Sequence, residues 1–365
     1  MSEMLKNINK IPVRTWNWLG VNDFSMSHDY PNAIEYNQDA LKSKNIENVE
    51  SFKIDKGSYL DSIFNSVDIG VSKETYDDVL DNFNTGYYVL AKENSKVKEP
   101  IIIDYSLDSQ NSVLLDNNVL IAEKNSEMTV VIRYSSTEGK YFHNGVTRLY
   151  AKEGARINLI KVQLLGEENI HIDAVGAIQE QGANINYIFI ELGANKTVTS
   201  CKNYLQGSKS EANIDTIYLG DKERKIDVNY VVQHLGKATM SNIKVNGVLM
   251  DKANKIFRGT LDFKKGASAS KGSEEESTIL LSSNVRNRSI PLLLCSEDDV
   301  QGQHAASTGR IDDAKLFYLM SRGFSEKEAK KIIIEAAFNP ITQKIPLEDL
   351  REEISEFIRG RISNA

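Results

Sequence analysis

The 365-residue chain is poor in the residues from which covalent and metal-bound frameworks are built. It has two cysteines, Cys201 and Cys295, and neither belongs to a C-x-x-C pair. Two thiols cannot form a disulfide framework, and they are too few for a thiolate-ligated metal cluster, which takes four protein ligands. We therefore expect a protein of a reducing compartment that holds no cofactor stably.

Long blocks of like charge and long apolar runs are also missing. The 44 lysines and arginines and the 51 acidic residues give a net charge of −7 without a basic stripe, which argues against nucleic acid as a partner. Wholly apolar runs such as residues 290–295 are far shorter than the roughly 20 residues of a membrane helix. The opening residues lack the apolar run of a signal peptide. These features predict a cytoplasmic protein that binds neither nucleic acid nor a membrane.

The local motifs of common catalytic sites are absent as well. No G-x-x-x-x-G-K-[ST] loop occurs, and the run GASASKGS at residues 266–273 has its lysine and glycines in the wrong order to hold a phosphate. Neither G-x-S-x-G nor H-E-x-x-H occurs, which argues against a serine hydrolase and a zinc protease. We therefore expect no catalytic residues in this chain and no enzyme activity of its own.

Residues 86–308 consist of short β-branched and aromatic runs separated by Gly, Asn, Asp and Ser. Four similar segments begin at residues 126, 154, 182 and 211, a repeat of 28 to 29 residues. Such a period is typical of a solenoid, in which each unit buries its apolar face by stacking on its neighbours. We predict a mainly-β fold with a β-helix core over residues 86–308, and a sandwich or barrel is the alternative. Segments 184–192 and 225–235 are apolar on both faces, which predicts a further layer outside these strands.

The residues before the predicted β-helix have a different composition. Residues 1–85 mix polar loops with short helical patterns and are expected to form an N-terminal mixed region. Trp16 and Trp18 lie there among apolar neighbours, and we interpret them as a packing anchor because tryptophan buries a large area; a recognition surface is the alternative.

Residues 309–365 are expected to form a C-terminal helical domain. A first helix should end at Gly323, and a second should begin at the capping box of Ser325 and Glu328. Residues 339–340, Asn-Pro, should stop the second helix. A third helix over residues 346–362 has an apolar stripe that could be partly core and partly a docking surface.

Few residues are candidates for a site. His304 follows the acidic residues 297–299 at a turn, and imidazole with carboxylates suits ferrous iron or another divalent metal; a histidine without a ligand role is the alternative. Cys295 follows three leucines and is expected to be a small buried hydrophobe, whereas the polar surroundings of Cys201 allow exposure. Both thiols are interpreted as structural. The acidic run 274–276 is expected to be a solvated turn in a flexible loop.

Residues 282–329 carry an ordered pattern, SSNVRNRSIPLLLCSEDDVQGQHAASTGRID followed by LFYLMSRGFSEKEA. This pattern resembles the SufB/SufD family, the scaffold proteins of SUF iron–sulfur cluster assembly. The resemblance implies a right-handed parallel β-helix with a C-terminal helical domain. It also implies a non-catalytic scaffold whose β-helix end pairs with a SufB-like subunit and whose helical tail docks the SufC ATPase. The residues of that docking region would be Phe317, Tyr318, Arg322 and Gly323.

Single residues make the chain more similar to SufD than to SufB. SufB members follow the histidine with a glutamate and carry an upstream sulfur-receiving cysteine, whereas this chain has Ala305 and Glu276 at these positions. The resemblance therefore implies that His304 helps to hold transient iron or a nascent iron–sulfur cluster at the interface with SufB. Some SufD members have a cysteine two residues before the histidine, and the residue here is Gly302, which leaves open whether the chain supplies a thiolate.

Other functions remain open on the sequence. The chain could be a self-sufficient SufB-like scaffold that works with SufC only, or a structural adaptor in which His304 has no metal role. The isolated chain could also form a homodimer. A β-helix enzyme acting on polysaccharide would need paired acids on adjacent turns and usually a secretory signal, which the sequence does not show.

Overall fold

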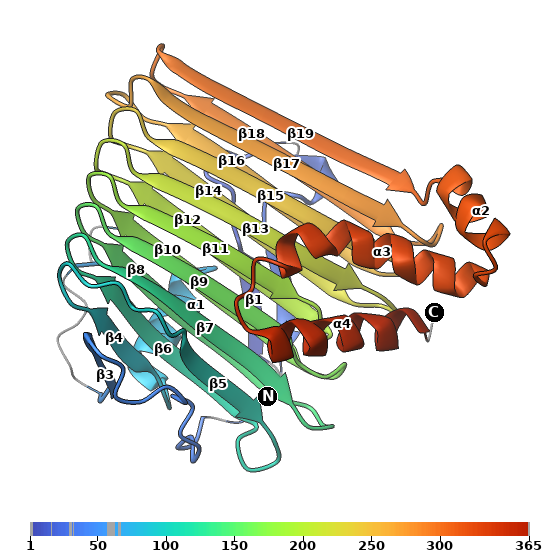
Figure 1. Ribbon diagram of the computed structural model, residues 1–365, viewed down its shortest axis with the longest axis horizontal. Coiled ribbons are helices and arrows are strands. Elements are labelled where there is room, and N and C mark those ends of the chain that lie inside the picture. Colours follow the sequence, from blue (N-terminus) through green and yellow to red (C-terminus); the bar gives the residue numbers. More distant parts are fainter. Residues whose placement is uncertain are drawn as a thin grey trace.

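The computed structural model describes residues 3–15, 17–28, 31, 33–56, 63–64 and 67–363. Within these residues, two facing β-sheets form a parallel β-solenoid of about eight turns, and helices follow it at the C-terminal end (Figure 1). From residue 87 onward, consecutive strands alternate between the two sheets, so that each turn adds one strand to each sheet. The prediction of a mainly-β solenoid is therefore confirmed over the alternative of a sandwich or barrel.

Both sheets extend through the whole solenoid. Of the described strands, nine form one sheet in the order β18 (Arg286–Cys295), β16 (Asn254–Phe263), β14 (Lys225–His234), β12 (Lys196–Leu205), β10 (Ile170–Gln179), β8 (Phe142–Ala151), β6 (Val113–Ala122), β4 (Tyr87–Ala91) and β3 (Val49–Lys53). Eight form the other in the order β19 (Val300–Arg310), β17 (Ser270–Leu280), β15 (Met240–Leu249), β13 (Glu211–Gly220), β11 (Asn184–Glu191), β9 (Arg156–Leu164), β7 (Glu127–Ser136) and β5 (Ile101–Leu107). Neighbouring strands are parallel, except that β3 is antiparallel to β4.

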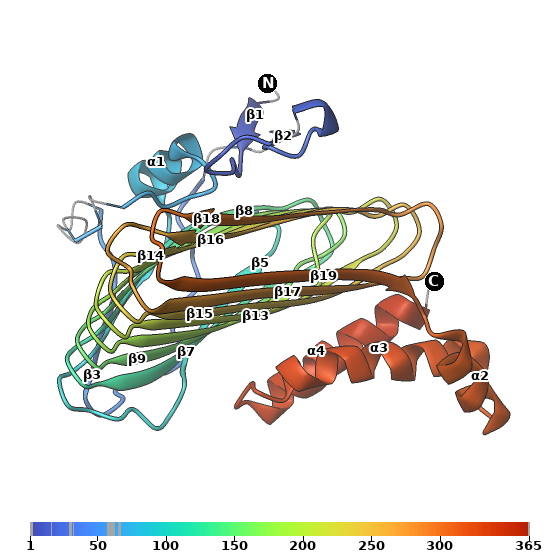
Figure 2. The same ribbon diagram turned by 90° about the horizontal axis from the view of Figure 1, so that it is seen from above.

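Among the described residues, three apolar cores hold the layers together. The largest fills the lumen between the two sheets with inward-facing side chains such as Leu159, Ile185 and Phe257. A second core lies between the outer face of the nine-stranded sheet and the N-terminal elements β1 (Glu3–Ile8), β2 (Phe24–His28) and α1 (Lys73–Asn82). A third lies between the outer face of the eight-stranded sheet and the C-terminal helices (Figure 2). The further layer predicted outside segments 184–192 and 225–235 is present: Ile188 and Ile190 pack into the third core, whereas Asp227 and Asn229 form hydrogen bonds with the N-terminal segment.

An N-terminal strap, defined as residues 9–15 and 17–23, crosses the outer face of the nine-stranded sheet. The guanidinium of Arg258 is fully buried, donates from Nε to the Val21 carbonyl at 2.6 Å and pairs with Asp227 at 2.6 Å. The Asn9 amide also donates to Asp227, at 2.8 Å. The strap is therefore held by buried polar contacts, and the predicted tryptophan anchor is wrong for Trp18, whose surface is 79% exposed in the short 3-10 helix η1 (Asn17–Leu19). Trp16 lies outside the described residues.

Three helices follow the last strand: α2 (Asp313–Ser321), α3 (Glu326–Thr342) and α4 (Glu348–Ser363). Gly323 has a φ of 97° just after α2, and the Ser325–Glu328 capping box opens α3, both as predicted. The predicted stop at residues 339–340 is wrong. Pro340 lies inside the last turn of α3, and the helix ends at Thr342. The apolar stripe of α4 belongs wholly to the third core, because Leu350, Ile354 and Ile358 are buried there.

No helix in the described ranges is both long enough and apolar enough to cross a membrane.

Candidate metal and partner site at the open end of the solenoid

The last turn of the solenoid is left open. β18 and β19 are the edge strands of the two sheets, and within the described chain each pairs with a neighbour on one side only (Figure 1). Most of their residues are exposed or half-buried, whereas β10 and β12 in the middle of the solenoid are almost fully buried. An edge strand presents unpaired backbone N–H and C=O groups, which can pair with a strand from another chain. The open end is therefore a surface suited to strand-to-strand pairing.

The register of the last turns places His304 on the inner face of this end. β19 pairs with β17 in parallel, and His304 is the partner of Glu274. Glu274 is buried and faces the lumen, because its carboxylate occupies the space where a Cβ on Gly259 of the opposite sheet would lie. Partners on parallel strands share a face, so His304 also points inward, yet it is exposed because no further turn covers it. Across the same end, Asn287 donates to Thr308 at 2.9 Å.

A buried group of titratable residues lies directly beneath His304. Lys255 Nζ pairs with Glu276, which also accepts from the Tyr218 hydroxyl at 3.2 Å. Burial, and then the nearby Glu276, raise the pKa of Glu274 to about 8, while burial lowers the pKa of Lys255. Glu274 Oε2 and Glu276 Oε2 have no hydrogen-bond partner among the described residues.

The acidic run 274–276 thus corrects a sequence prediction. It was expected to be a solvated turn in a flexible loop, but it lies in β17, and only Glu275 faces solvent. A strand alternates its side chains between two faces, so Glu274 and Glu276 enter the lumen together. Glutamate usually lies at the surface, but the position of these two residues in the strand buries both carboxylates.

The acidic turn that precedes β19 has a structural task, and His304 lies beyond it, within the strand and not on the turn as expected. A carboxylate oxygen of Glu297 accepts from the backbone N–H of Gly266 at 2.8 Å, and one of Asp299 accepts from the backbone N–H of Ala269 at 3.1 Å. These bonds tie the last turn to the turn before it. In the part of the chain that the structure describes, no three His, Cys, Asp or Glu side chains are grouped so that they could hold a metal ion. A metal at His304 would therefore need at least one ligand from another chain or from solvent.

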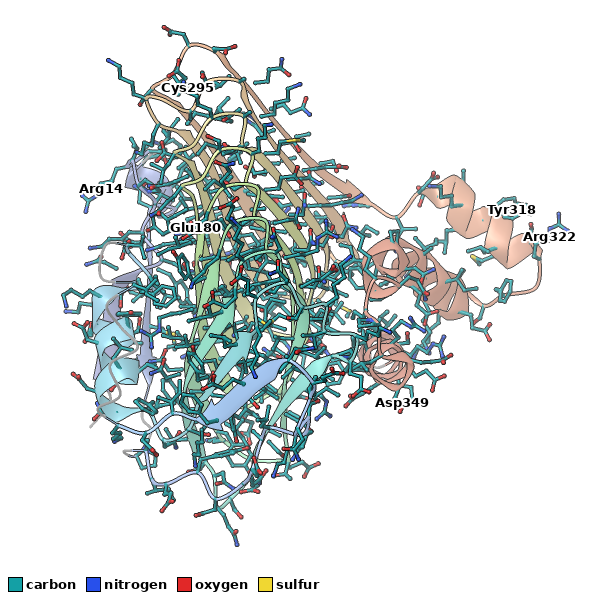
Figure 3. The ribbon with its side chains drawn as sticks, turned by 60° about the vertical axis from the view of Figure 1, so that its left-hand side comes forward. Arg14, Glu180, Cys295, Tyr318, Arg322 and Asp349 are labelled. Carbon is teal, nitrogen blue, oxygen red and sulfur yellow. The ribbon has the colours of Figure 1, made fainter. Side chains whose placement is uncertain are left out.

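The two cysteines have the opposite exposure to that expected. Cys201 is fully buried in the lumen, and burial raises the pKa of its thiol far above the ordinary value. Cys295 is exposed at the end of β18, at the open end of the solenoid (Figure 3). Its partner in β16 is Phe263, which belongs to the inner core, so Cys295 is an inward-facing position that no further turn covers.

A second exposed surface lies on α2, which projects away from the solenoid (Figure 3). Phe317 is 74% exposed and Tyr318 is 57% exposed, with the Arg322 guanidinium 5.3 Å from the Tyr318 ring centre. Gly323 follows directly and turns the chain toward α3. A groove of about 710 Å³ runs beside α2, and its lining is mostly apolar: Ile279, Ala314, Lys315, Tyr318, Leu319, Ile332, Ile333, Ala336 and Ala337.

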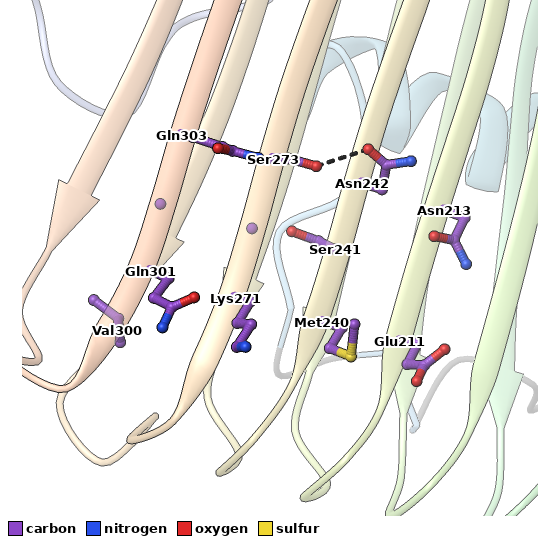
Figure 4. A pocket seen from close by; sticks show the side chains of 12 residues that line it. Glu211, Asn213, Met240, Ser241, Asn242, Lys271, Ser273, Val300, Gln301 and Gln303 are labelled. Carbon is purple, nitrogen blue, oxygen red and sulfur yellow. Dashed lines mark hydrogen bonds between the residues drawn. The ribbon is translucent and has the colours of Figure 1, made fainter.

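The outer face of the eight-stranded sheet carries a polar groove of about 500 Å³ close to the open end (Figure 4). Its floor continues a ladder of amide side chains, in which Asn186 donates to Asn158 at 2.9 Å and Asn213 donates to Asn186 at 3.0 Å. Ser273 donates to Asn242 at 2.7 Å further along. Such side chains satisfy one another along the stack, and we interpret the ladder as a means of fixing the register of the strands.

The fold defines a class of protein: a parallel β-solenoid with C-terminal helices and an open last turn. Comparison with known proteins identifies the class: residues 105–337 match the model of the SUF system FeS cluster assembly SufBD core domain. Because this match covers more than half of the chain, the protein belongs to the SufBD family.

Individual relatives support the same assignment. The iron-sulfur cluster assembly protein SufD of Bacillus subtilis is 27% identical over 282 residues, which cover 76% of this chain and 64% of the relative. A SufBD family protein of Pyrococcus horikoshii is 28% identical over 291 residues, with 77% and 63% covered, and one of Mycobacterium leprae is 24% identical over 290 residues, with 77% and 73% covered. The chain matches slightly less than two thirds of the length of the first two relatives.

Proposed function

We propose that this protein is the SufD-like scaffold subunit of a SUF complex, in which it pairs with a SufB-like subunit, docks a SufC-like ATPase and helps to acquire iron. The observation that carries the proposal is the asymmetry of the solenoid. Each outer face is covered in part by the chain's own segments, while the last turn is left open with His304 on its inner face. The relatives of this chain include an iron–sulfur cluster assembly SufD protein.

Pairing through β18 and β19 would complete the unfinished end. A second solenoid of the same family has the same strand spacing, so its edge strands can continue both sheets and satisfy the free backbone groups. Pairing would also cover the inward-facing residues of the last turn. His304 would then lie between two subunits, shielded from bulk water.

Iron would be the cargo of this site and would bind there only transiently. A neutral imidazole binds ferrous iron, and His304 is exposed for this purpose at the unpaired end. One histidine alone binds weakly, which suits an ion that must be passed on as the cluster forms. The remaining ligands would come from the SufB-like subunit and from sulfide.

The ATPase would dock on α2. This chain has no P-loop, so nucleotide hydrolysis must take place in a partner. Phe317 and Tyr318 expose two aromatic rings beside an apolar groove, an arrangement common in the centres of protein interfaces. ATP binding and hydrolysis would move α2 and, through α3, bias the paired ends between closed and open arrangements.

The test is co-purification of the chain with its SufB-like and SufC-like subunits, followed by analysis of iron and sulfide. His304→Ala should leave the complex intact and reduce its iron content, whereas Phe317→Ser with Tyr318→Ser should release the SufC-like subunit and keep the SufB-like one. Glu326→Gln, an exposed change at the start of α3, serves as control. Failure of the wild type to bind either partner would refute the scaffold proposal, and unchanged iron in His304→Ala would reduce the chain to a structural adaptor.

A further inference from the structure

We propose that Glu274 is a second ligand, with His304, for the divalent metal ion at the open end. This inference rests on the proposed function and extends it by assigning a carboxylate that lies inside the solenoid, one strand below the histidine. It also explains why an acidic side chain lies at a lumen position where the strands beneath carry apolar residues.

The geometry places the two side chains within reach of one ion. Glu274 and His304 are partners on adjacent parallel strands, which lie about 4.8 Å apart, and both point into the lumen. Two ligand atoms on one ion, each bonded at about 2.1 Å, are separated by about 3 Å. A change of side-chain rotamer alone can bring the carboxylate and the imidazole to this separation. In the next two strands the equivalent positions are the buried Ile243 and Ile214, so the acid appears only beneath the open end.

The charges beneath the open end leave room for a cation. Lys255 is bound to Glu276, to the backbone carbonyl of Arg288 at 3.3 Å and to the Ser289 hydroxyl at 3.2 Å. Its ammonium group is therefore committed to partners other than Glu274. Glu276 is the carboxylate that binds this ammonium, and an oxygen of Glu274 has no hydrogen-bond partner among the described residues. A buried polar atom without a partner is costly, and a metal ion would satisfy it.

Glycine at position 259 makes the arrangement possible. An ideal Cβ at Gly259 would lie 2.5 Å from Glu274 Oε1 and 2.6 Å from Oε2, so any larger residue would displace the carboxylate. The lumen is thus shaped to hold this group under His304. Glu276 lies beside it but is retained by Lys255 and Tyr218, which makes Glu274 the more available ligand.

The experiment measures metal binding without relying on cluster assembly. Co²⁺ is titrated under anaerobic conditions into the complex with the SufB-like and SufC-like subunits, and its d–d absorption and dissociation constant are recorded; iron content after purification is the second readout. The variants are Glu274→Gln, His304→Ala and Glu275→Gln. Glu275 is the matched control, because it is the next residue of the same strand and faces solvent. Far-UV circular dichroism and gel filtration verify folding and assembly.

We expect Glu274→Gln to weaken Co²⁺ binding at least tenfold and to alter the d–d spectrum, while Glu275→Gln matches the wild type. Wild-type binding by Glu274→Gln alongside loss in His304→Ala would overturn the role of Glu274 and leave the proposed function intact. Absence of metal from an intact wild-type complex would overturn both metal roles. If the wild type forms no complex, the scaffold proposal fails, and the same titration of the isolated chain decides whether Glu274 binds metal. If Glu274→Gln does not fold, Glu274→Asp takes its place: it keeps the carboxylate one methylene shorter, so a ligand role predicts a changed spectrum.

Discussion

Glu191 offers a sharp test of how the solenoid holds charge inside its lumen. Its carboxylate is 4% exposed, and burial, followed by the charge of Asp173, raises its pKa to about 8. His171 Nε2 lies 3.9 Å away, but burial lowers the pKa of His171 well below its ordinary value. At 3.9 Å the attraction between the two charges does not offset the cost of burying both, so the folded protein keeps both groups neutral at pH 7.

The magnitude follows from linkage between protonation and folding. In the unfolded chain Glu191 has an ordinary pKa of 4.5, so the folded state binds one more proton between pH 4.5 and about 8. The stability associated with this proton is fully present below pH 4.5 and is lost as the pH rises through about 8. At 1.36 kcal/mol per pKa unit, the complete loss is on the order of 5 kcal/mol, of which about 2.5 kcal/mol falls between pH 6 and pH 9.

Glu191→Gln replaces the carboxyl by a neutral amide of the same shape and should remove this dependence. The free energy of unfolding is measured by urea titration with far-UV circular dichroism at pH 6 and pH 9, for the wild type, Glu191→Gln and the exposed control Glu223→Gln. We expect the variant to gain about 2.5 kcal/mol relative to the wild type between these two pH values, and the control to gain nothing. An equal difference at both pH values would show that Glu191 is ionised in the folded protein, and the argument from burial would be refuted.

Three further outcomes are expected. Burial lowers the pKa of His234 to about 4, so its contribution to stability is lost as the pH falls below 6.5; His234→Gln should lose about 2 kcal/mol less than the wild type between pH 7 and pH 5 in urea titrations. One thiol per chain, that of Cys295, should react with Ellman's reagent in the folded protein, and Cys201 should react only in denaturant. Arg258→Ala leaves Asp227 buried without its cation and should cost about 3–5 kcal/mol of unfolding free energy, with faster proteolysis of the strap.

The architecture was accessible from the sequence, whereas the register was not. The repeat that begins at residues 126, 154, 182 and 211 does mark strands of one sheet, namely β7, β9, β11 and β13. Aligning the repeats by their first residues, however, would pair Met128 with Arg156, whereas the structure pairs Met128 with Ile157. A slip of one residue exchanges the inner and outer faces of a strand. Turn lengths vary by a residue from one repeat to the next, and only the packed lumen decides which alignment holds.

Only part of the site could be predicted from the sequence, for the same reason. His304 stood out by its local sequence and by family resemblance, but the acidic run 274–276 looked like a turn because three glutamates in a row suggest solvent. One signal was available: Glu274 lies 30 residues before His304, close to the repeat length, and therefore at the equivalent position one turn earlier. The local composition indicates which side chains prefer water, but the stacking of the turns decides which of them are buried.

The exposure of the two cysteines could not be predicted from the local sequence. Both occupy inward positions, since Cys201 belongs to the inner core and Cys295 is the strand partner of the core residue Phe263. Their difference in exposure arises because β12 has turns on both sides, while β18 has a turn on one side only. The same fact exposes His304, whose side chain would be buried if one more turn followed. An inward-facing histidine can meet a metal ion and a partner only on the last turn of an unfinished solenoid, so the open end and the function we propose for it depend on each other.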